Sequence, residues 1–140
     1  KNMGNLYGSE YWTYTLPRRV GAQRAQAITQ GRLPIGPAQA LRLGLIDQVL
    51  GAESQAFDAL ARASAQTLAA QPGLPEKLAA KRAARADDET RKPLAAYREE
   101  ELREMHRNFY GFDPSYHVAR HHFVHRKPHA WTPRHLALHR

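Results

Sequence analysis

The most informative part of this sequence is residues 16–49, which read LPRRVGAQRAQAITQGRLPIGPAQALRLGLIDQV. Within it, residues 21–30 are predicted to form a helix, because apolar residues recur every three positions and Gly31 supplies a C-terminal stop. The recurring residues are Ala22, Ala25 and Ile28.

Two further elements are expected in the same stretch. Pro37 suits the first position of a short helix, which should run through Leu43 and end at Gly44. Residues 45–50 then form a short apolar run that is typical of a strand. Its apolar members are Leu45, Ile46, Val49 and Leu50.

Upstream of this stretch, a short helix is expected to begin after Gly8. Ser9 is a favourable N-cap, and Glu10 in the first turn would suit the positive end of the helix dipole. Pro17 disfavours helical geometry at Leu16, so we expect the helix to end there.

Downstream, apolar residues keep helical phase in four longer segments, which predicts a mostly α chain with one or two short strands. These helices are expected at residues 53–71, 75–88, 93–110 and 115–126. In the third of them, one side is predicted to face inward and the charged side outward. The inward residues are Leu94, Tyr97, Leu102, Met105 and Phe109, and the outward residues are Glu99, Glu100, Glu101 and Arg103.

The composition of the 140 residues fits at most one modest domain. Because the chain has no cysteine, disulfides and thiolate metal sites are excluded, and a reducing, cytoplasmic location is expected. A mean hydropathy of -0.66 and the lack of an apolar run near ~18 residues exclude a membrane span. The start at Lys1 has no signal-peptide pattern, and we expect a segment of a longer chain.

The formal net charge of +8 is concentrated at the two ends of the chain. Residues 1–50 carry +4, residues 51–105 carry −1 and residues 106–140 carry +5, and all eight histidines lie in the last segment. Basic ends favour an anionic partner, which could be nucleic acid, a nucleotide-bearing cofactor or an acidic protein.

An ordered string of residues resembles the second half of a crotonase domain, the fold of the enoyl-CoA hydratase/isomerase family. The string is Leu16-Pro17-Arg18-Arg19-Val20-Gly21, Ala25, Ile28, Gly31, Ile35, Ala40, Gly44-Leu45-Ile46 and Val49. The run Phe123-Val124-His125-Arg126-Lys127-Pro128 is similar to the basic ending of many crotonases.

This resemblance implies a mostly α fragment of an α/β crotonase fold, its C-terminal half with a helical tail. Residues 1–50 would be the second part of the core, including the active-site loop and helix. Residues 51–127 would form a C-terminal helical region, and residues 128–140 a flexible tail.

Two longer runs resemble one branch of that family, the C-terminal domain of carbon-monoxide-forming maturation factors of nickel–iron hydrogenases. They are Lys1-Asn2-Met3-Gly4 with Leu6-Tyr7-Gly8-Ser9-Glu10-Tyr11-Trp12-Thr13-Tyr14, and Asn108-Phe109-Tyr110-Gly111-Phe112-Asp113-Pro114-Ser115-Tyr116-His117 with Ala119-Arg120. With the stretch between them, the resemblance extends to about Lys127.

The second resemblance implies an activity and its cofactors. An N-terminal part would deliver a formyl group from formyltetrahydrofolate to coenzyme A, and the crotonase-like domain would release carbon monoxide from formyl-CoA for the hydrogenase iron. Other hydrogenase maturation proteins are implied partners. Since the chain matches only the latter part of the second domain, we expect it to be catalytically incomplete alone.

Glu10 is the predicted catalytic residue, because crotonases place the corresponding helix start beside the thioester carbonyl. Its carboxylate could take the formyl proton, or it could merely compensate a helix dipole. Tyr7 is the second candidate, as a hydrogen-bond donor to the thioester or the carboxylate. The aromatic residues Tyr11, Trp12 and Tyr14 could wall a pocket together with Tyr7, or at least two of the four could belong to the core.

The basic C-terminal region suits the phosphates of coenzyme A. Arg120, Arg126 and Lys127 are predicted to bind them, while Phe123 would pack on the adenine. The alternative is a solvated basic face.

Histidines at positions 117, 121 and 125 have the spacing of one helix face. No carboxylate or thiolate accompanies them at ligand spacing, so no physiological metal site is predicted.

Two other functions stay open. An ordinary enoyl-CoA hydratase or isomerase would use a second acid near or before Lys1, yet no glutamate appears between Lys1 and Ser9. A non-catalytic nucleic-acid-binding module would explain the charge, but it does not explain residues 16–49, and the sequence lacks a helix-turn-helix, zinc-finger or RNA-binding-sheet motif.

Overall fold

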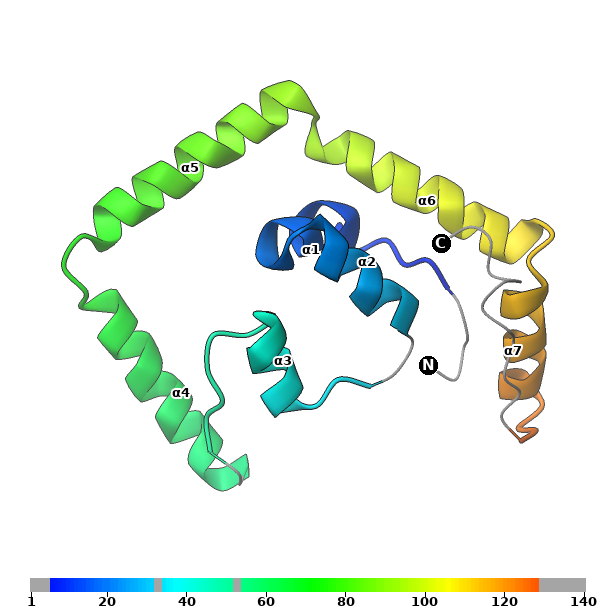
Figure 1. Ribbon diagram of the computed structural model, residues 1–140, viewed down its shortest axis with the longest axis horizontal. Helices are drawn as coiled ribbons and strands as arrows, with labels where there is room; N and C mark the ends of the chain where they lie inside the picture. Colours follow the sequence, from blue (N-terminus) through cyan, green and yellow to red (C-terminus); the bar gives the residue numbers. More distant parts are fainter. Residues whose placement is uncertain (1–5, 32–33, 52–53, 129–140) are drawn as a thin grey trace. The chain divides into compact units, whose positions relative to one another are not determined.

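The computed structural model describes residues 6–31, 34–51 and 54–128, and this part of the chain contains seven α-helices and no strand (Figure 1). The mostly α prediction is therefore confirmed for the described residues. Lys1-Asn2-Met3-Gly4 and residues 129–140 of the predicted tail lie outside them. The helices are α1 (Trp12–Val20), α2 (Ala22–Gly31), α3 (Pro37–Leu43), α4 (Ser54–Ala69), α5 (Leu74–Arg91), α6 (Leu94–Tyr110) and α7 (Pro114–Val124).

The strand predicted for residues 45–50 is wrong, because this segment is an irregular connection after α3. Its side chains do not enter a core: Ile46 and Val49 keep 36% and 47% of their surface exposed. The apolar run lacks the neighbouring strand that any strand needs for its backbone hydrogen bonds, at least within the described residues.

The chain divides into two compact units. One unit comprises Lys1–Gly36 and Leu94–Arg140 and contains α1, α2, α6 and α7; the other comprises Pro37–Pro93 and contains α3, α4 and α5. In the first unit, α1 packs against α2 and α6, and α6 packs against α7. None of the described helices is long and apolar enough to cross a membrane.

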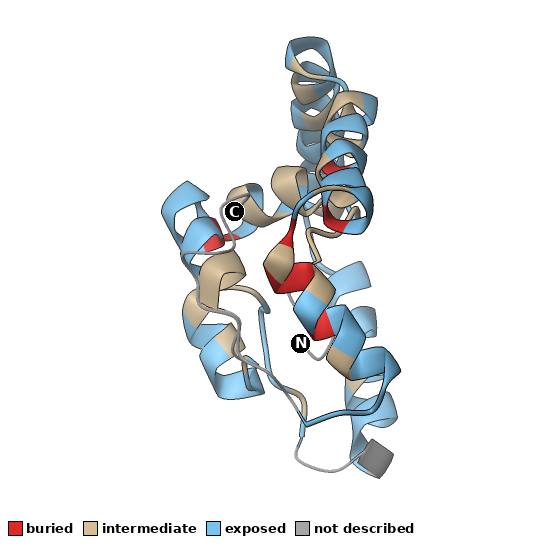
Figure 2. Cartoon of the chain, turned by 90° about the vertical axis from the view of Figure 1, so that its right-hand side faces the viewer, coloured by how far each residue is buried: buried red, intermediate tan, exposed pale blue. Residues whose placement is uncertain are grey.

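The described residues that are buried all belong to the first unit (Figure 2). Four are apolar or aromatic, namely Val20, Ala25, Tyr116 and Ala119, and four are polar, namely Glu101, Asn108, Asp113 and Ser115. Burying a polar group is costly unless it is hydrogen-bonded, so the four polar residues must have specific partners.

Helix α6 turns a different side inward from the one predicted. Glu101 is fully buried, whereas Leu102 is 45% exposed. The inward side follows Tyr97, Glu101 and Asn108, which lie on one face at helical spacing. The prediction of an outward Glu101 and an inward Leu102 was wrong. Backbone amides in the loop before α1 and in α1 itself donate hydrogen bonds to the Glu101 carboxylate and so stabilise it in the buried position.

Helix α1 also differs from its prediction at both ends. It begins at Trp12, and Tyr11 rather than Ser9 occupies the N-cap position, with a left-handed φ of 59°. Pro17 lies inside the helix, which continues because the Gly21 amide donates to the Pro17 carbonyl at 2.8 Å. Contacts of α1 with α2 and α6 offset the local preference against helical geometry before proline.

Candidate functional site

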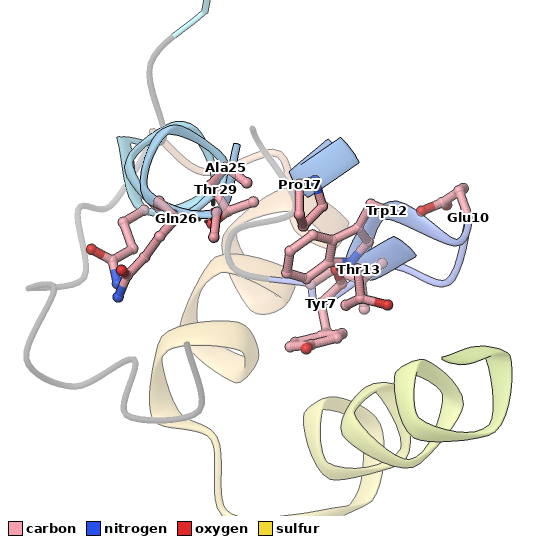
Figure 3. Close-up of a pocket in the computed structure, with 11 residues that line it drawn as sticks. Tyr7, Glu10, Trp12, Thr13, Pro17, Ala25, Gln26 and Thr29 are labelled. Carbon is pink, nitrogen blue, oxygen red and sulfur yellow. Dashed lines mark hydrogen bonds between the residues drawn. The ribbon is translucent and has the colours of Figure 1, made fainter. Parts of the chain in front are cut away.

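The first unit contains a cavity of about 510 Å³ between the loop that precedes α1, helix α1 and helix α2 (Figure 3). It brings together the two predicted catalytic residues, Tyr7 and Glu10, which both line it. The remaining lining residues are Leu6, Trp12, Thr13, Pro17, Ala22, Ala25, Gln26, Thr29 and Gln30. A cavity of this size suits a small ligand or the end of a larger one.

Tyr7 is held in place by contacts of its ring and of its backbone. Its ring packs against Trp12 with 5.1 Å between the ring centroids and 54° between the planes. The Trp12 indole Nε1–H donates to the Tyr7 carbonyl at 3.0 Å, and the Tyr7 amide donates to Asn108 Oδ1 at 2.7 Å. The backbone of Tyr7 is thus tied both to the start of α1 and to α6.

Glu10 is an exposed residue at the edge of the cavity, two positions before α1 begins. The first turn of α1 contains no acidic residue, so Glu10 does not have the dipole-compensating position that the sequence allowed. Its Oε2 accepts a hydrogen bond from the Ser9 amide at 3.0 Å. The carboxylate is therefore oriented by the loop while staying accessible to a ligand.

Gly8 makes room for this orientation. Its φ of +83° lies in the left-handed region, and a Cβ at this position would stand 2.7 Å from Glu10 Oε2. Any side chain at position 8 would therefore displace the Glu10 carboxylate.

The N-terminus of α1 is satisfied by a buried carboxylate from α6. Glu101 Oε2 accepts from the Tyr11 amide at 2.8 Å, and Glu101 Oε1 accepts from the Thr13 amide at 2.9 Å and the Thr13 hydroxyl at 2.5 Å. A negative charge at this end also interacts favourably with the helix dipole. Glu101 thus bonds the free amides at the start of α1 and compensates its dipole, the two roles that were predicted for Ser9 and Glu10.

A second buried network joins α6 to α7. Asn108 Nδ2 donates to Asp113 Oδ2 at 2.6 Å. Asp113 Oδ1 caps α7 by accepting from the Tyr116 amide at 3.1 Å and from the Ser115 hydroxyl at 2.9 Å. His117 Nε2 lies 2.9 Å from the Gly111 carbonyl. The run 108–117 therefore comprises the end of α6, a short connection and the start of α7, and its polar residues bond to one another and, through Asn108, to the Tyr7 loop.

The aromatic cluster divides between two surroundings. Tyr7 and Trp12 line the cavity, whereas Tyr14 packs edge-on against Tyr97 with 5.3 Å between centroids. The Arg98 guanidinium lies 5.7 Å from the Tyr11 ring centroid. All four predicted aromatic residues are half-buried, so none of them forms the fully buried core.

The predicted coenzyme-binding residues lie away from the described cavity lining, on α7 and just beyond it. Arg120 and Phe123 are exposed on α7, which ends at Val124 rather than at Arg126. Arg126 follows with a positive φ of 51°, and Lys127 Nζ lies 3.1 Å from His121 Nε2.

The described residues contain no group of three or more side chains that could hold a metal ion. His121 and His125 stack with 4.4 Å between ring centroids. Lost solvation, with the nearby charges of Lys127, His125 and His122, lowers the pKa of His121 below its ordinary value.

Comparisons with known proteins show a family and a hydrogenase maturation factor that this chain resembles. The profile of the enoyl-CoA hydratase/isomerase family matches residues 3–134. Over its whole length the chain is 56% identical to the hydrogenase maturation factor HoxX of Bradyrhizobium diazoefficiens, of which it covers 25%.

Solved structures of HypX also match this chain. Two variants of HypX from Aquifex aeolicus match all of this chain and 25% of their own, with TM-scores of 0.81 and 0.82 and identities of 44% and 43%. The chain thus spans about a quarter of the length of these relatives.

Proposed function

The chain belongs to the enoyl-CoA hydratase/isomerase family, and from this premise we propose that it supplies part of the thioester site of a cytoplasmic hydrogenase maturation factor that releases carbon monoxide from formyl-CoA. The observation that carries the proposal is the cavity that Tyr7 and Glu10 line together. The identity of 56% to HoxX over the whole chain supports the assignment to hydrogenase maturation.

The proposed reaction needs one base and no external oxidant or reductant. Glu10 accepts the formyl proton, and the electron pair of the C–H bond becomes the lone pair on the carbon of carbon monoxide. The C–S bond breaks with its electron pair on sulfur, and Glu10 returns the proton to the thiolate. The products are carbon monoxide and coenzyme A with a free thiol.

The cavity fits the acyl end of a short thioester. Tyr7 and Trp12 supply aromatic surface, and Thr13 and Glu10 supply polar groups beside it. Tyr7 is proposed to donate a hydrogen bond to the thioester oxygen or to the Glu10 carboxylate. A formyl group is small, and it is proposed to be oriented by the Tyr7 and Trp12 rings together with the Glu10 carboxylate.

We assign the phosphates of coenzyme A to the basic end of the first unit. Arg120, Arg126 and Lys127 offer three cations for the phosphates, and exposed Phe123 offers a face for the adenine. Formyltetrahydrofolate would be used outside this chain, because the chain covers only a quarter of the relatives. Other maturation proteins are the proposed partners.

Replacing Arg126 and Lys127 together by alanine tests the assignment of the phosphate site. In the full-length protein, loss of desolvated phosphate contacts should weaken coenzyme A binding by about 1–3 kcal/mol, measured by isothermal titration calorimetry. An unchanged affinity for coenzyme A would show that these residues belong to an ordinary solvated surface.

Ordinary enoyl-CoA hydration is the competing activity. Among the described residues that line the cavity, Glu10 is the one carboxylate, while the hydration chemistry expected from the family uses a second acid. The two activities are therefore separated by the substrate that the full-length protein consumes.

The full-length protein should release carbon monoxide from formyl-CoA, detected by the absorbance change of reduced haemoglobin, and should leave crotonyl-CoA unhydrated. Hydration of crotonyl-CoA without release of carbon monoxide would contradict the proposal and support enoyl-CoA hydration instead.

A further inference from the structure

We propose that Glu101 and Asn108 of α6 are positioning residues that hold the loop carrying Tyr7 and Glu10 at the cavity. The inference rests on the proposed function for its consequence, while its structural basis is a set of hydrogen bonds between segments far apart in the chain. Both side chains are fully buried, and they are seven residues apart, which places them on one face two turns apart.

Glu101 fixes the backbone directly after Glu10. Its two carboxylate oxygens accept from Tyr11 and Thr13 across 90 and 88 residues of sequence. Charge-assisted hydrogen bonds that backbone amides donate to a buried carboxylate are among the stronger ones in proteins. Since Tyr11 is the neighbour of Glu10, any shift of the start of α1 would move the Glu10 backbone.

Asn108 fixes the backbone before Glu10. Its Oδ1 accepts from the Tyr7 amide across 101 residues, while its Nδ2 donates to Asp113. Asp113 holds the side-chain amide of Asn108, so Asn108 Oδ1 cannot turn away from the Tyr7 loop without breaking the bond between Asn108 Nδ2 and Asp113. The loop is therefore anchored on both sides of Gly8, Ser9 and Glu10.

The two anchors explain how an exposed carboxylate keeps a defined place. Glu10 bonds to the neighbouring Ser9 amide, a contact that moves with the loop. The position of Glu10 relative to the cavity walls on α1 and α2 is therefore set by the anchors. Misplacement of a catalytic group by about 1 Å can reduce a rate by about a hundredfold.

The test uses the full-length protein with Glu101→Ala and with Asn108→Ala. Glu99→Ala is the matched control, because Glu99 is an exposed glutamate on the same helix. Three quantities are measured: amide hydrogen exchange of residues 6–13, kcat and KM for formyl-CoA, and the dissociation constant of coenzyme A.

The expected result is local loosening with a selective loss of rate. Amides of residues 6–13 should exchange about tenfold faster or more in the two variants. The value of kcat should fall about tenfold to a hundredfold, while the coenzyme A affinity stays within about twofold. The Glu99→Ala control should match wild type in all three measurements.

Glu101→Gln separates positioning from folding. A glutamine keeps one acceptor oxygen for α1 but presents an NH₂ group to the other donor, so both exchange and kcat should fall between wild type and Glu101→Ala. If Glu101→Ala does not fold, Glu101→Gln and Asn108→Ala are compared with wild type alone, and each should show faster exchange of residues 6–13 and a lower kcat.

Two results would overturn the proposal. Unchanged exchange at residues 6–13 would show that the anchors do not hold the loop, and faster exchange with wild-type kcat would show that the anchoring does not serve the reaction. If wild-type protein formed no carbon monoxide, the proposed function would fail separately, and the exchange data would still decide whether the loop is anchored.

Discussion

The smallest feature on which the proposed chemistry depends is the missing side chain of Gly8. The residue allows a left-handed backbone conformation and leaves space for Glu10 Oε2, which a Cβ would approach to 2.7 Å. Gly21 also has a positive φ, +85° with ψ 155°, but a Cβ there would meet nothing within 4 Å. The pair separates backbone strain from displacement of the carboxylate.

Gly8→Ala should therefore lose activity where Gly21→Ala does not. Both substitutions place alanine at a positive φ and should each destabilise the protein by about 1–3 kcal/mol, measured by scanning calorimetry. Only Gly8→Ala should lower the rate of carbon monoxide release, by about tenfold or more, because it moves Glu10. Equal rates in the two variants would argue against a role for the Glu10 position.

A second residue-scale prediction concerns His121. Lost solvation and the charges of Lys127, His125 and His122 lower its pKa, so its protonated form is disfavoured in the folded chain. Lys127→Ala removes one of these charges and should raise the pKa of His121 toward the ordinary value, measured by NMR titration of the imidazole. A pKa that does not move would show that Lys127 has no influence on this ring.

The sign of the associated pH effect follows from the lowered pKa. The unfolded chain takes up the proton first, so the contribution disfavours folding as the pH falls through the ordinary histidine pKa of about 6.5. His121→Asn should reduce this part of the acid sensitivity.

At the scale of elements, the starts of α1 and α7 depend on carboxylates in different ways. Asp113 caps α7 from the neighbouring position, whereas Glu101 satisfies the start of α1 from another helix. Local capping of this kind is visible in a sequence; long-range capping is not, because it requires knowing which helix packs beside the loop. Ser9 was therefore a reasonable but wrong choice.

Asp113→Ala tests the local cap. Loss of the bonds from Tyr116 and Ser115 should destabilise the protein by about 0.5–2 kcal/mol, measured by calorimetry. It should also speed hydrogen exchange in α7, since Asp113 is buried and the donors that it caps lose their acceptor. Asp113→Asn keeps one capping oxygen and should lose less. Equal losses in both variants would contradict the capping role.

Helices themselves were predictable because proline, glycine and apolar periodicity act locally. The range Pro37–Leu43 agrees with its prediction, and α6 and α7 begin within one residue of theirs. The inward side of α6 was not predictable, because hydropathy places Glu101 outside, and the partners that bury it lie about ninety residues earlier. Within the candidate site, the proximity of Tyr7 and Glu10 followed from sequence, while the roles of Gly8, Glu101 and Asn108 needed the structure.

At the scale of the whole molecule, burial is unevenly distributed. Every described residue that is buried lies in the unit that contains the cavity, and half of these residues are polar. In the second unit, apolar side chains such as Phe57 and Leu68 are about half exposed. The hydrogen-bonded core thus coincides with the unit that holds the candidate site.

The net charge of +8 gives a prediction at the same scale. Any binding of duplex DNA should be nonspecific, should weaken steeply between low and physiological salt, and should be displaced by coenzyme A if both use the basic end. Fluorescence anisotropy with a labelled duplex measures this competition. DNA binding that survives excess coenzyme A would favour the nucleic-acid-binding alternative.

The most direct test of the account is the rate of carbon monoxide release by full-length protein carrying Glu10→Gln. Glu76→Gln, an exposed position in the first turn of α5, is the matched control. Loss of the base should lower the rate about a hundredfold or more, with coenzyme A binding retained and the control unaffected. Release at the wild-type rate by Glu10→Gln would contradict the assignment of Glu10 as the base.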